Sequence, residues 1–263
     1  MGINDEALVN IVDEVTKDQF HYAQLGISSP SNGQGPNGGW QLFAEDGRMR
    51  LYSRELEVDG LVCDPLKAVH VVKGVTAYEM CHRFFNPAVR YEWEETLETM
   101  KVVDVIDANT MVFHQIHKRI WPAAQRDAVF WSHIRKITDP QPSCLSADDI
   151  SPLNRPDIKL HDVWIVCNNS IEKPEILVES CVRVKLTVSL VCETYIPTDT
   201  TDYKTLTRDQ ILCKIIYSST INPGGWAPAS LLRPLYRREY PRFLECFSNY
   251  VISATKTKPI TFE

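Results

Sequence analysis

The segment 181–195 reads CVRVKLTVSLVCETY and is the clearest strand in the chain. Apolar side chains occupy every second position: Val182, Val184, Leu186, Val188 and Leu190. Polar side chains stand between them: Arg183, Lys185, Thr187 and Ser189. Successive side chains of a strand point to opposite faces, so this alternation predicts an antiparallel sheet with one buried face and one wet face.

Further strand patterns lie on both sides of this segment. They cover residues 40–44, 48–56, 68–75, 99–106, 110–120, 128–137, 163–167 and 211–221. A short helix is expected over 76–85, ended near Asn86-Pro87, and a long helix over 229–253. The long helix carries an apolar stripe, and Pro234 and Pro241 are expected to kink it.

The remaining segments are predicted from composition and spacing. Residues 4–20 have apolar positions at helical spacing, and 26–39 form a Gly-, Ser-, Asn- and Pro-rich linker. Surface loops are expected where Pro, Asp, Ser and Thr accumulate, over 138–162, 172–180 and 197–206. Together these elements predict an α+β fold in which a curved antiparallel sheet is covered by the C-terminal helix, with space for a cavity between them.

The overall composition is that of an ordinary globular protein. The chain has 263 residues, of which 44% are hydrophobic and 24% charged, and its net charge is −6. This excludes a mostly disordered chain and argues against a nucleic-acid binder that works by bulk positive charge. No uncharged apolar run approaches the roughly 18 residues that cross a bilayer, so we expect any membrane contact to be peripheral.

The eight cysteines are spread along the chain and include no CxxC pair. No secretory signal precedes them, so we expect reduced thiols in the cytosol. His114 and His117 have H-x-x-H spacing, but on a strand they face opposite sides, which disfavours a metal site. The sequence contains no G-x-S-x-G, P-loop or G-x-G-x-x-G motif, although a scattered Cys–His or Ser–His pair leaves a hydrolase open.

Four polar residues stand at positions where a buried site is possible. Gln115, Asn168 and Tyr217 each share a strand face with apolar residues, and Glu94 lies just before the strand series. If those faces point inward, each polar group needs a partner. The alternatives are capping of exposed strand ends or bonding to the backbone for the first three, and a solvated acid or an i,i+4 pair with Arg90 for Glu94.

Two tryptophans stand at the ends of strands. Trp121 follows a strand and precedes Pro122, with Lys118, Arg119 and Arg126 nearby, while Trp226 follows two glycines. An amphipathic indole flanked by cations suits a bilayer interface with anionic headgroups. The alternatives are a core tryptophan or a cation–π pair.

These tryptophan motifs resemble those of the START lipid-transfer domains that carry ceramide. The matching stretches are 117–123 (HKRIWPA) with 125–127 (QRD), 221–230 (INPGGWAPAS), 64–68 (DPLKA), 72–75 (VKGV), 164–168 (WIVCN) and 238–241 (REYP). The resemblance runs from about residue 40 to the end. The chain departs from the family pattern in the long 138–162 segment, in Asn169 where an aromatic is expected, and in Pro234.

The resemblance implies a helix-grip fold with an internal apolar lipid cavity over 40–263, with residues 1–39 packing on the same domain. It implies that Glu94, Gln115 and Asn168 bind the head of ceramide, assisted by Tyr217. Trp121 and Trp226 would touch the membrane at the cavity mouth.

The implied activity is non-enzymatic transfer of ceramide from the endoplasmic reticulum to the Golgi, by a cytoplasmic monomer without a metal or cofactor. Full-length proteins of this type also carry a phosphoinositide-binding PH domain and an endoplasmic-reticulum-docking motif. Neither is found here, so we expect the transfer module alone. Carriers of diacylglycerol, a phospholipid or a sterol, an acyl hydrolase, and a ligand-gated interaction module stay open as alternatives.

Overall fold

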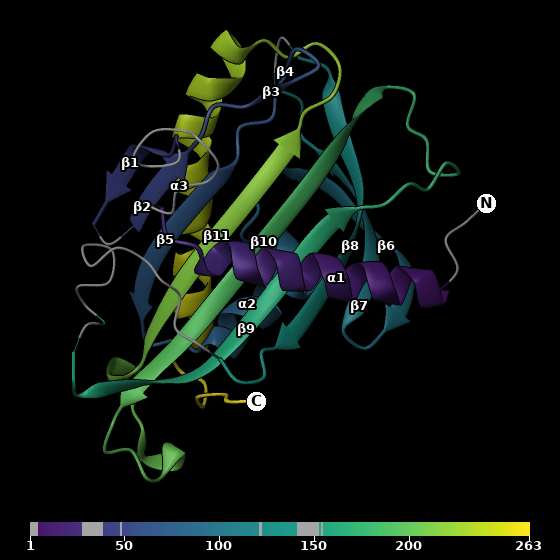
Figure 1. Ribbon diagram of the computed structural model, residues 1–263. Coiled ribbons are helices and arrows are strands. Elements are labelled where there is room, and N and C mark those ends of the chain that lie inside the picture. The colour runs from purple at the N-terminus through teal and green to yellow at the C-terminus, as the bar shows by residue number, and fades with distance from the viewer. Residues whose placement is uncertain (1–4, 28–38, 48, 121–122, 141–152, 154) are drawn as a thin grey trace.

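The computed structural model describes residues 5–27, 39–47, 49–120, 123–140, 153 and 155–263 (Figure 1). Its main feature is a nine-stranded sheet in the order β1-β2-β5-β11-β10-β9-β8-β7-β6. The strands are β1 (Gln41–Asp46), β2 (Met49–Ser53), β5 (Leu66–Lys73), β6 (Leu97–Asp107), β7 (Thr110–His117), β8 (Gln125–Lys136), β9 (Ile158–Ser170), β10 (Cys181–Pro197) and β11 (Leu212–Asn222).

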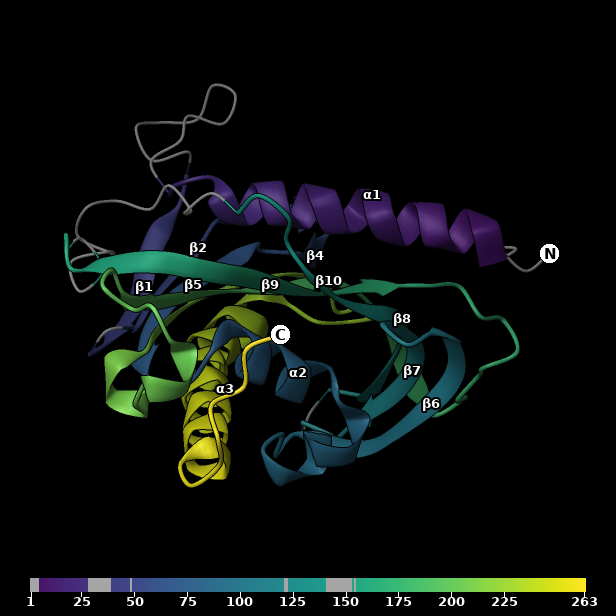
Figure 2. The ribbon, with the colours of Figure 1, turned by 90° about the horizontal axis from the view of Figure 1, so that it is seen from below.

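Neighbouring strands of this order pair antiparallel, as the alternation in 181–195 predicts. The start of β10 also pairs with the start of β8, and this short ladder is parallel. Two short strands that the sequence patterns do not separate, β3 (Glu57–Val58) and β4 (Leu61–Val62), form a hairpin of their own. The sheet curves strongly toward β6 and β7 (Figure 2).

Helices lie on both faces of the sheet (Figure 2). On the inner, concave face lie α2 (Ala77–Phe85) and α3 (Ala229–Thr255). The main apolar cluster joins them to the sheet through residues such as Phe84, Leu190, Phe247 and Val251. The predicted grip of the sheet around the C-terminal helix is therefore present.

The outer face is not the wet face that the sequence predicts. The N-terminal helix α1 (Asp5–Gln24) lies across it, packing Leu8 and Val12 on Trp131, and Ala23 on Val191. Ser189 of β10, whose hydroxyl donates to Gln19 of α1 at 3.3 Å, is consequently buried. Alternation correctly divided β10 into two faces, but it could not show that a segment more than 150 residues earlier would cover the polar one.

One segment boundary also differs from the prediction. The segment 138–162 was expected to be a loop, but β9 already begins at Ile158, because Ile158 and Leu160 pack against Tyr195. Residues 141–152 and 154 lie outside the described part of the chain. The C-terminal helix is one element that contains both Pro234 and Pro241, and the expected kink at each stays a prediction.

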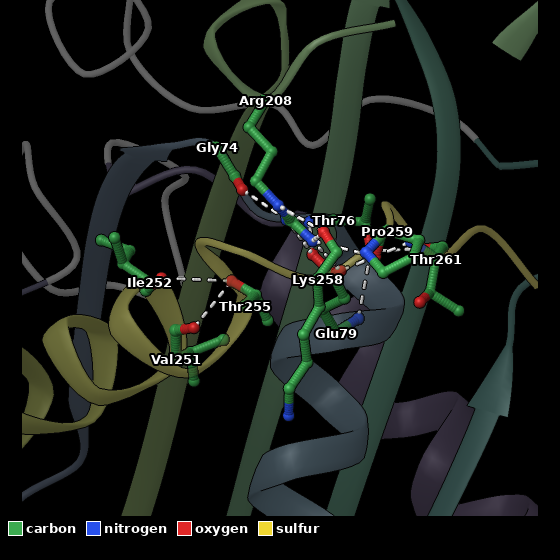
Figure 3. Close-up of polar contacts among 10 residues, drawn as sticks. All are labelled: Gly74, Thr76, Glu79, Arg208, Val251, Ile252, Thr255, Lys258, Pro259 and Thr261. Atoms are coloured by element: carbon green, nitrogen blue, oxygen red, sulfur yellow. Dashed lines mark hydrogen bonds and ion pairs between the residues drawn. The ribbon is translucent and has the colours of Figure 1, made fainter. Parts of the chain in front are cut away.

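A largely buried ion pair between α2 and Arg208 ties the C-terminal tail after α3 to α2 (Figure 3). Glu79 of α2 accepts from Arg208 through both carboxylate oxygens, at 2.8 and 3.0 Å, and closes a capping box with Thr76. Arg208 also donates to the carbonyls of Lys258 and Pro259, each at 3.0–3.3 Å. This network, the Glu79–Arg208 latch, joins three segments that are distant in sequence.

Among the described residues no helix has the length and apolar character needed to span a membrane. The described cysteines are free thiols, and most are buried.

Candidate functional site

The four polar residues singled out from the sequence are all buried. Glu94 follows the 3-10 helix η1 (Pro87–Glu92), and Gln115, Asn168 and Tyr217 lie on β7, β9 and β11. Their exposed fractions lie between 3% and 6%. The solvated-acid alternative for Glu94 and the exposed-strand-end alternative for the others are therefore wrong.

Strand register places the three strand residues on the inner face, toward α3. Phe113, Val166 and Ile215, two residues before Gln115, Asn168 and Tyr217, belong to inner-face apolar clusters. Residues two apart on a strand share a face.

The register also shows how far apart these three residues lie along the strand direction. Asn168 and Ser219 both pair with Val188, so Asn168 and Tyr217 lie close to one row across the sheet. Gln115 pairs with Ala128, whereas Asn168 pairs with Ser132 of the same strand, β8. Four residues along a strand correspond to about 13 Å. A ligand that contacts both amides must therefore extend along the inner face.

Glu94 forms an ion pair with Arg90, through Oε2 and the guanidinium Nε. Arg90 is itself buried, donates to the carbonyl of Phe84 at 2.8 Å, and lies over the Trp93 ring at 4.4 Å. The i,i+4 pair that the sequence left open therefore exists, but in a dry site rather than on a surface. Desolvated charges of this kind persist only when paired and hydrogen-bonded.

The second oxygen of Glu94 points toward His117. Oε1 lies 4.0 Å from His117 Nδ1, beyond hydrogen-bond distance, so His117 does not donate to it directly. Burial lowers the pKa of His117, although the Glu94 carboxylate opposes part of that effect. A neutral imidazole can either donate or accept, so Arg90 and His117 join the site that the sequence predicted without them.

His114, the other member of the H-x-x-H motif, points away from His117. Its Nε2 lies 2.9 Å from Asp127 Oδ2. The predicted opposite orientation of the two histidines is confirmed. Within the described ranges, no group of three or more His, Cys, Asp or Glu side chains is arranged to hold a metal ion.

The two amide side chains have spare hydrogen-bonding capacity. Asn168 Oδ1 is buried and has no partner among the described residues. Gln115 Nε2 approaches only the thioether of Met100, at 3.4 Å, and a thioether is a weak acceptor. Leaving a buried polar group unpaired costs about 1–3 kcal/mol, so these atoms favour a polar ligand at the inner face.

Tyr217 lies beside α3, with its ring 5.8 Å from Phe243 and 6.2 Å from Tyr240. Burial, and then the neighbouring Tyr240, raise the pKa of Tyr217 well above its usual value. The hydroxyl therefore keeps its proton and can donate to a ligand oxygen. Glu94 and Arg90 also act on it electrostatically, which places these three residues in one region.

Trp226 is exposed, with 71% of its surface accessible, in the turn between β11 and α3. The core-tryptophan alternative is therefore wrong for this residue. Trp121 lies outside the described residues. The three cations expected beside them donate to backbone carbonyls: Lys118 to Glu95, Arg119 to Ala123, and Arg126 to Ala124, Pro223 and Trp226.

A separate groove of about 370 Å³ lies near the β3–β4 hairpin. It is lined by Leu56, Val58, Cys63, Asn169, Ser170, Lys185, Leu186, Thr187, Thr220 and Asn222. None of the four predicted head-group residues contributes to it, so it is distinct from the inner-face site.

The inner-face site and the grip of the sheet on α3 can be compared with known proteins. The START domain family matches residues 30–253. The chain belongs to the START domain family. Solved START structures show the same fold: human StAR-related lipid transfer protein 5 has a TM-score of 0.67 at 14% identity, over 95% of this chain and 99% of that chain. Human STARD10 has a TM-score of 0.63 at 12% identity, over 98% of this chain and 83% of that chain. The expected helix-grip fold is confirmed.

Curated relatives of this START domain carry the name ceramide transfer protein. The mouse (Mus musculus) protein is 41% identical over 252 residues, which is 95% of this chain and 36% of the relative. The Cricetulus griseus protein is 40% identical over 262 residues, which is 99% of this chain and 40% of the relative. The chain thus spans about 36–40% of the length of these relatives.

Proposed function

We propose that this START domain is a non-enzymatic carrier that holds one ceramide molecule between the sheet and α3. The observation that carries the proposal is the buried polar set of Glu94, Gln115, Asn168 and Tyr217. Within this set Asn168 Oδ1 is an acceptor with no partner among the described residues. Ceramide's head has two hydroxyls and an amide, which offer donors to the acceptors of this set. The relatives named ceramide transfer protein support the same ligand.

The need for a carrier follows from the cost of exposing lipid chains to water. Each CH₂ group contributes about 0.8 kcal/mol on burial, so a two-chain lipid with roughly 30 methylenes would lose over 20 kcal/mol. Spontaneous exchange through water is correspondingly slow. A protein that encloses the chains lowers this barrier without any chemical step.

The proposal extends to where the domain works. We infer delivery from the endoplasmic reticulum to the Golgi, by a cytoplasmic monomer that touches each membrane briefly. Residues 1–39 would belong to the same working unit as 40–263, since α1 packs Leu8 and Val12 on the sheet. Trp226 and Trp121 would form the membrane contact.

Repeated turnover is the decisive test of the carrier. Donor vesicles that contain radiolabelled ceramide should lose label to acceptor vesicles, with more ceramide moved than protein present and no change in the lipid. A released fatty acid would identify an acyl hydrolase, and binding without transfer would identify a ligand-gated module. Preferential transfer of diacylglycerol, a phospholipid or a sterol would overturn the ceramide assignment.

Trp226→Ala should weaken vesicle binding and slow transfer while leaving the melting temperature unchanged. The exposed indole contributes nothing to the core, but its loss removes an interfacial anchor. Vesicle co-sedimentation and thermal unfolding measure the two effects. Val105→Ala is the matched control, because Val105 is also an exposed apolar residue but lies near the C-terminal end of β6. A clear fall in melting temperature, or unchanged vesicle binding, would contradict the membrane role.

A further inference from the structure

The turn that presents Trp226 is tightly packed. It joins β11 to α3 at the end of the molecule where β8 and β10 begin (Figure 1). Gly224 and Gly225 have φ angles of +61° and +55°, and Gly224 N–H donates to Asn222 Oδ1 at 3.0 Å. A Cβ on Gly224 would lie 2.6 Å from the carbonyl oxygen of Arg183. Only glycine therefore lets the turn lie directly on the start of β10.

Arg126 of β8 holds both sides of this turn. Its Nε donates to the carbonyl of Pro223 at 3.3 Å, and Nη2 reaches the carbonyl of Trp226 at 3.5 Å. Its Nη1 donates to the carbonyl of Ala124 at 2.6 Å, in the loop that follows β7. One guanidinium thus spans two loops that are about a hundred residues apart in the sequence.

These contacts place an exposed indole on a fixed backbone. The Trp226 side chain is open to solvent, whereas the carbonyls before and within its turn are bound to Arg126. A flexible turn would lose conformational freedom when its side chain entered a membrane, and that loss would weaken binding. A turn that is already ordered avoids most of this cost.

We propose that Arg126 is a positioning residue for membrane contact, which acts by clamping the Trp226 turn rather than by attracting anionic headgroups. The inference rests on the proposed membrane role of Trp226 and adds to it the residue that orders the turn. It also revises the expectation from sequence, in which Arg126 served as a headgroup cation. Arginine suits the role because its planar fork carries several donors, whereas lysine offers a single point charge.

Arg126→Lys separates the two roles, since it keeps the charge and loses the fork. We expect about tenfold weaker binding to pure phosphatidylcholine vesicles, the size of one charge-assisted hydrogen bond. The loss should persist in high salt and on vesicles that also contain phosphatidylserine. In a Trp226→Ala background, Arg126→Lys should produce no further loss. Arg238→Lys is the control, because Arg238 is exposed and pairs with its neighbour Glu239.

The outcomes distinguish this inference from the proposed function. If Trp226→Ala weakens vesicle binding but Arg126→Lys does not, the membrane role stands and the clamp is refuted. A loss confined to anionic vesicles at low salt also refutes the clamp. If Trp226→Ala itself has no effect, the membrane role fails. Should Arg126→Lys unfold, Asn222→Ala removes another support of the turn, and the same loss is expected.

Discussion

Glu94→Gln is expected to weaken ceramide extraction from vesicles by about 5- to 30-fold, the difference between a charged and a neutral acceptor. Glutamine keeps the shape of the side chain and one oxygen, but it loses the charge that strengthens a bond from a ceramide hydroxyl. Glu94→Ala should abolish extraction, because it removes the acceptor altogether. Extraction of radiolabelled ceramide, with circular dichroism to verify folding, measures both variants.

The neighbouring acid supplies the control for this prediction. Glu95 is exposed and paired with Arg242 on α3, so Glu95→Gln should extract ceramide normally. Glu94→Ala also leaves buried Arg90 without its carboxylate, and loss of one partner of a buried pair costs about 3–5 kcal/mol of stability. Glutamine also lacks the charge, but its remaining oxygen can still accept from Arg90, so the glutamine variant carries the functional test. A folded Glu94→Gln protein that extracts ceramide as well as the unmodified protein would remove Glu94 from the head-group site.

Glu79→Ala should lower the free energy of unfolding by about 3–5 kcal/mol, the usual cost of breaking a buried ion pair. Glu79 is buried and accepts from Arg208, from Thr76 N–H at 3.1 Å and from Thr261 N–H at 3.4 Å (Figure 3). Its removal would leave the Arg208 charge without its carboxylate and remove the link between Arg208 and α2, although Thr76 still donates to the carbonyl of Thr261. For a domain of this size the melting temperature should fall by about 10 °C. Urea unfolding and thermal scans measure the change.

An exposed pair shows whether burial is the cause. Glu172 and Lys185 form a salt bridge with side chains 76% and 66% exposed, so Glu172→Ala should change stability by only about 0.5 kcal/mol. Equal effects of Glu79→Ala and Glu172→Ala would show that the Glu79–Arg208 latch contributes no more than a surface contact.

The sequence predicted the strands well where a clear period was present. In β10 and β11 the alternation of apolar and polar residues assigned each side chain to a face, and the face of Tyr217 was correct. The β3–β4 hairpin was missed because each of its strands has only two residues, too few to show a period. The start of β9 was missed because its first residues follow a Pro- and Asp-rich segment, although their packing on Tyr195 holds them in a strand.

In the candidate site, too, some residues could be identified from the local sequence pattern and others only from contacts between distant segments. Gln115 and Asn168 could be identified because each continues an apolar stripe with a polar group, which is unusual if that stripe is buried. Glu94 gained its role only from the resemblance to START domains, whereas the two tryptophans were already candidates for a bilayer interface from their positions at strand ends. Arg90 and His117 were not predicted as site residues, because their meeting with Glu94 depends on how η1 packs beside β7.

What the sequence alone determined is therefore the α+β class, the face that most strand residues take, and membership of the START domain family through its motifs. These follow from local periodicity and from short motifs, which do not depend on distant contacts. Only the tertiary structure decided that α1 covers the polar face of β10, that Arg126 binds the Trp226 turn, and that Arg208 reaches Glu79. Each of these joins segments about a hundred or more residues apart, and such partners are chosen by strand register and packing rather than by any pattern in the chain.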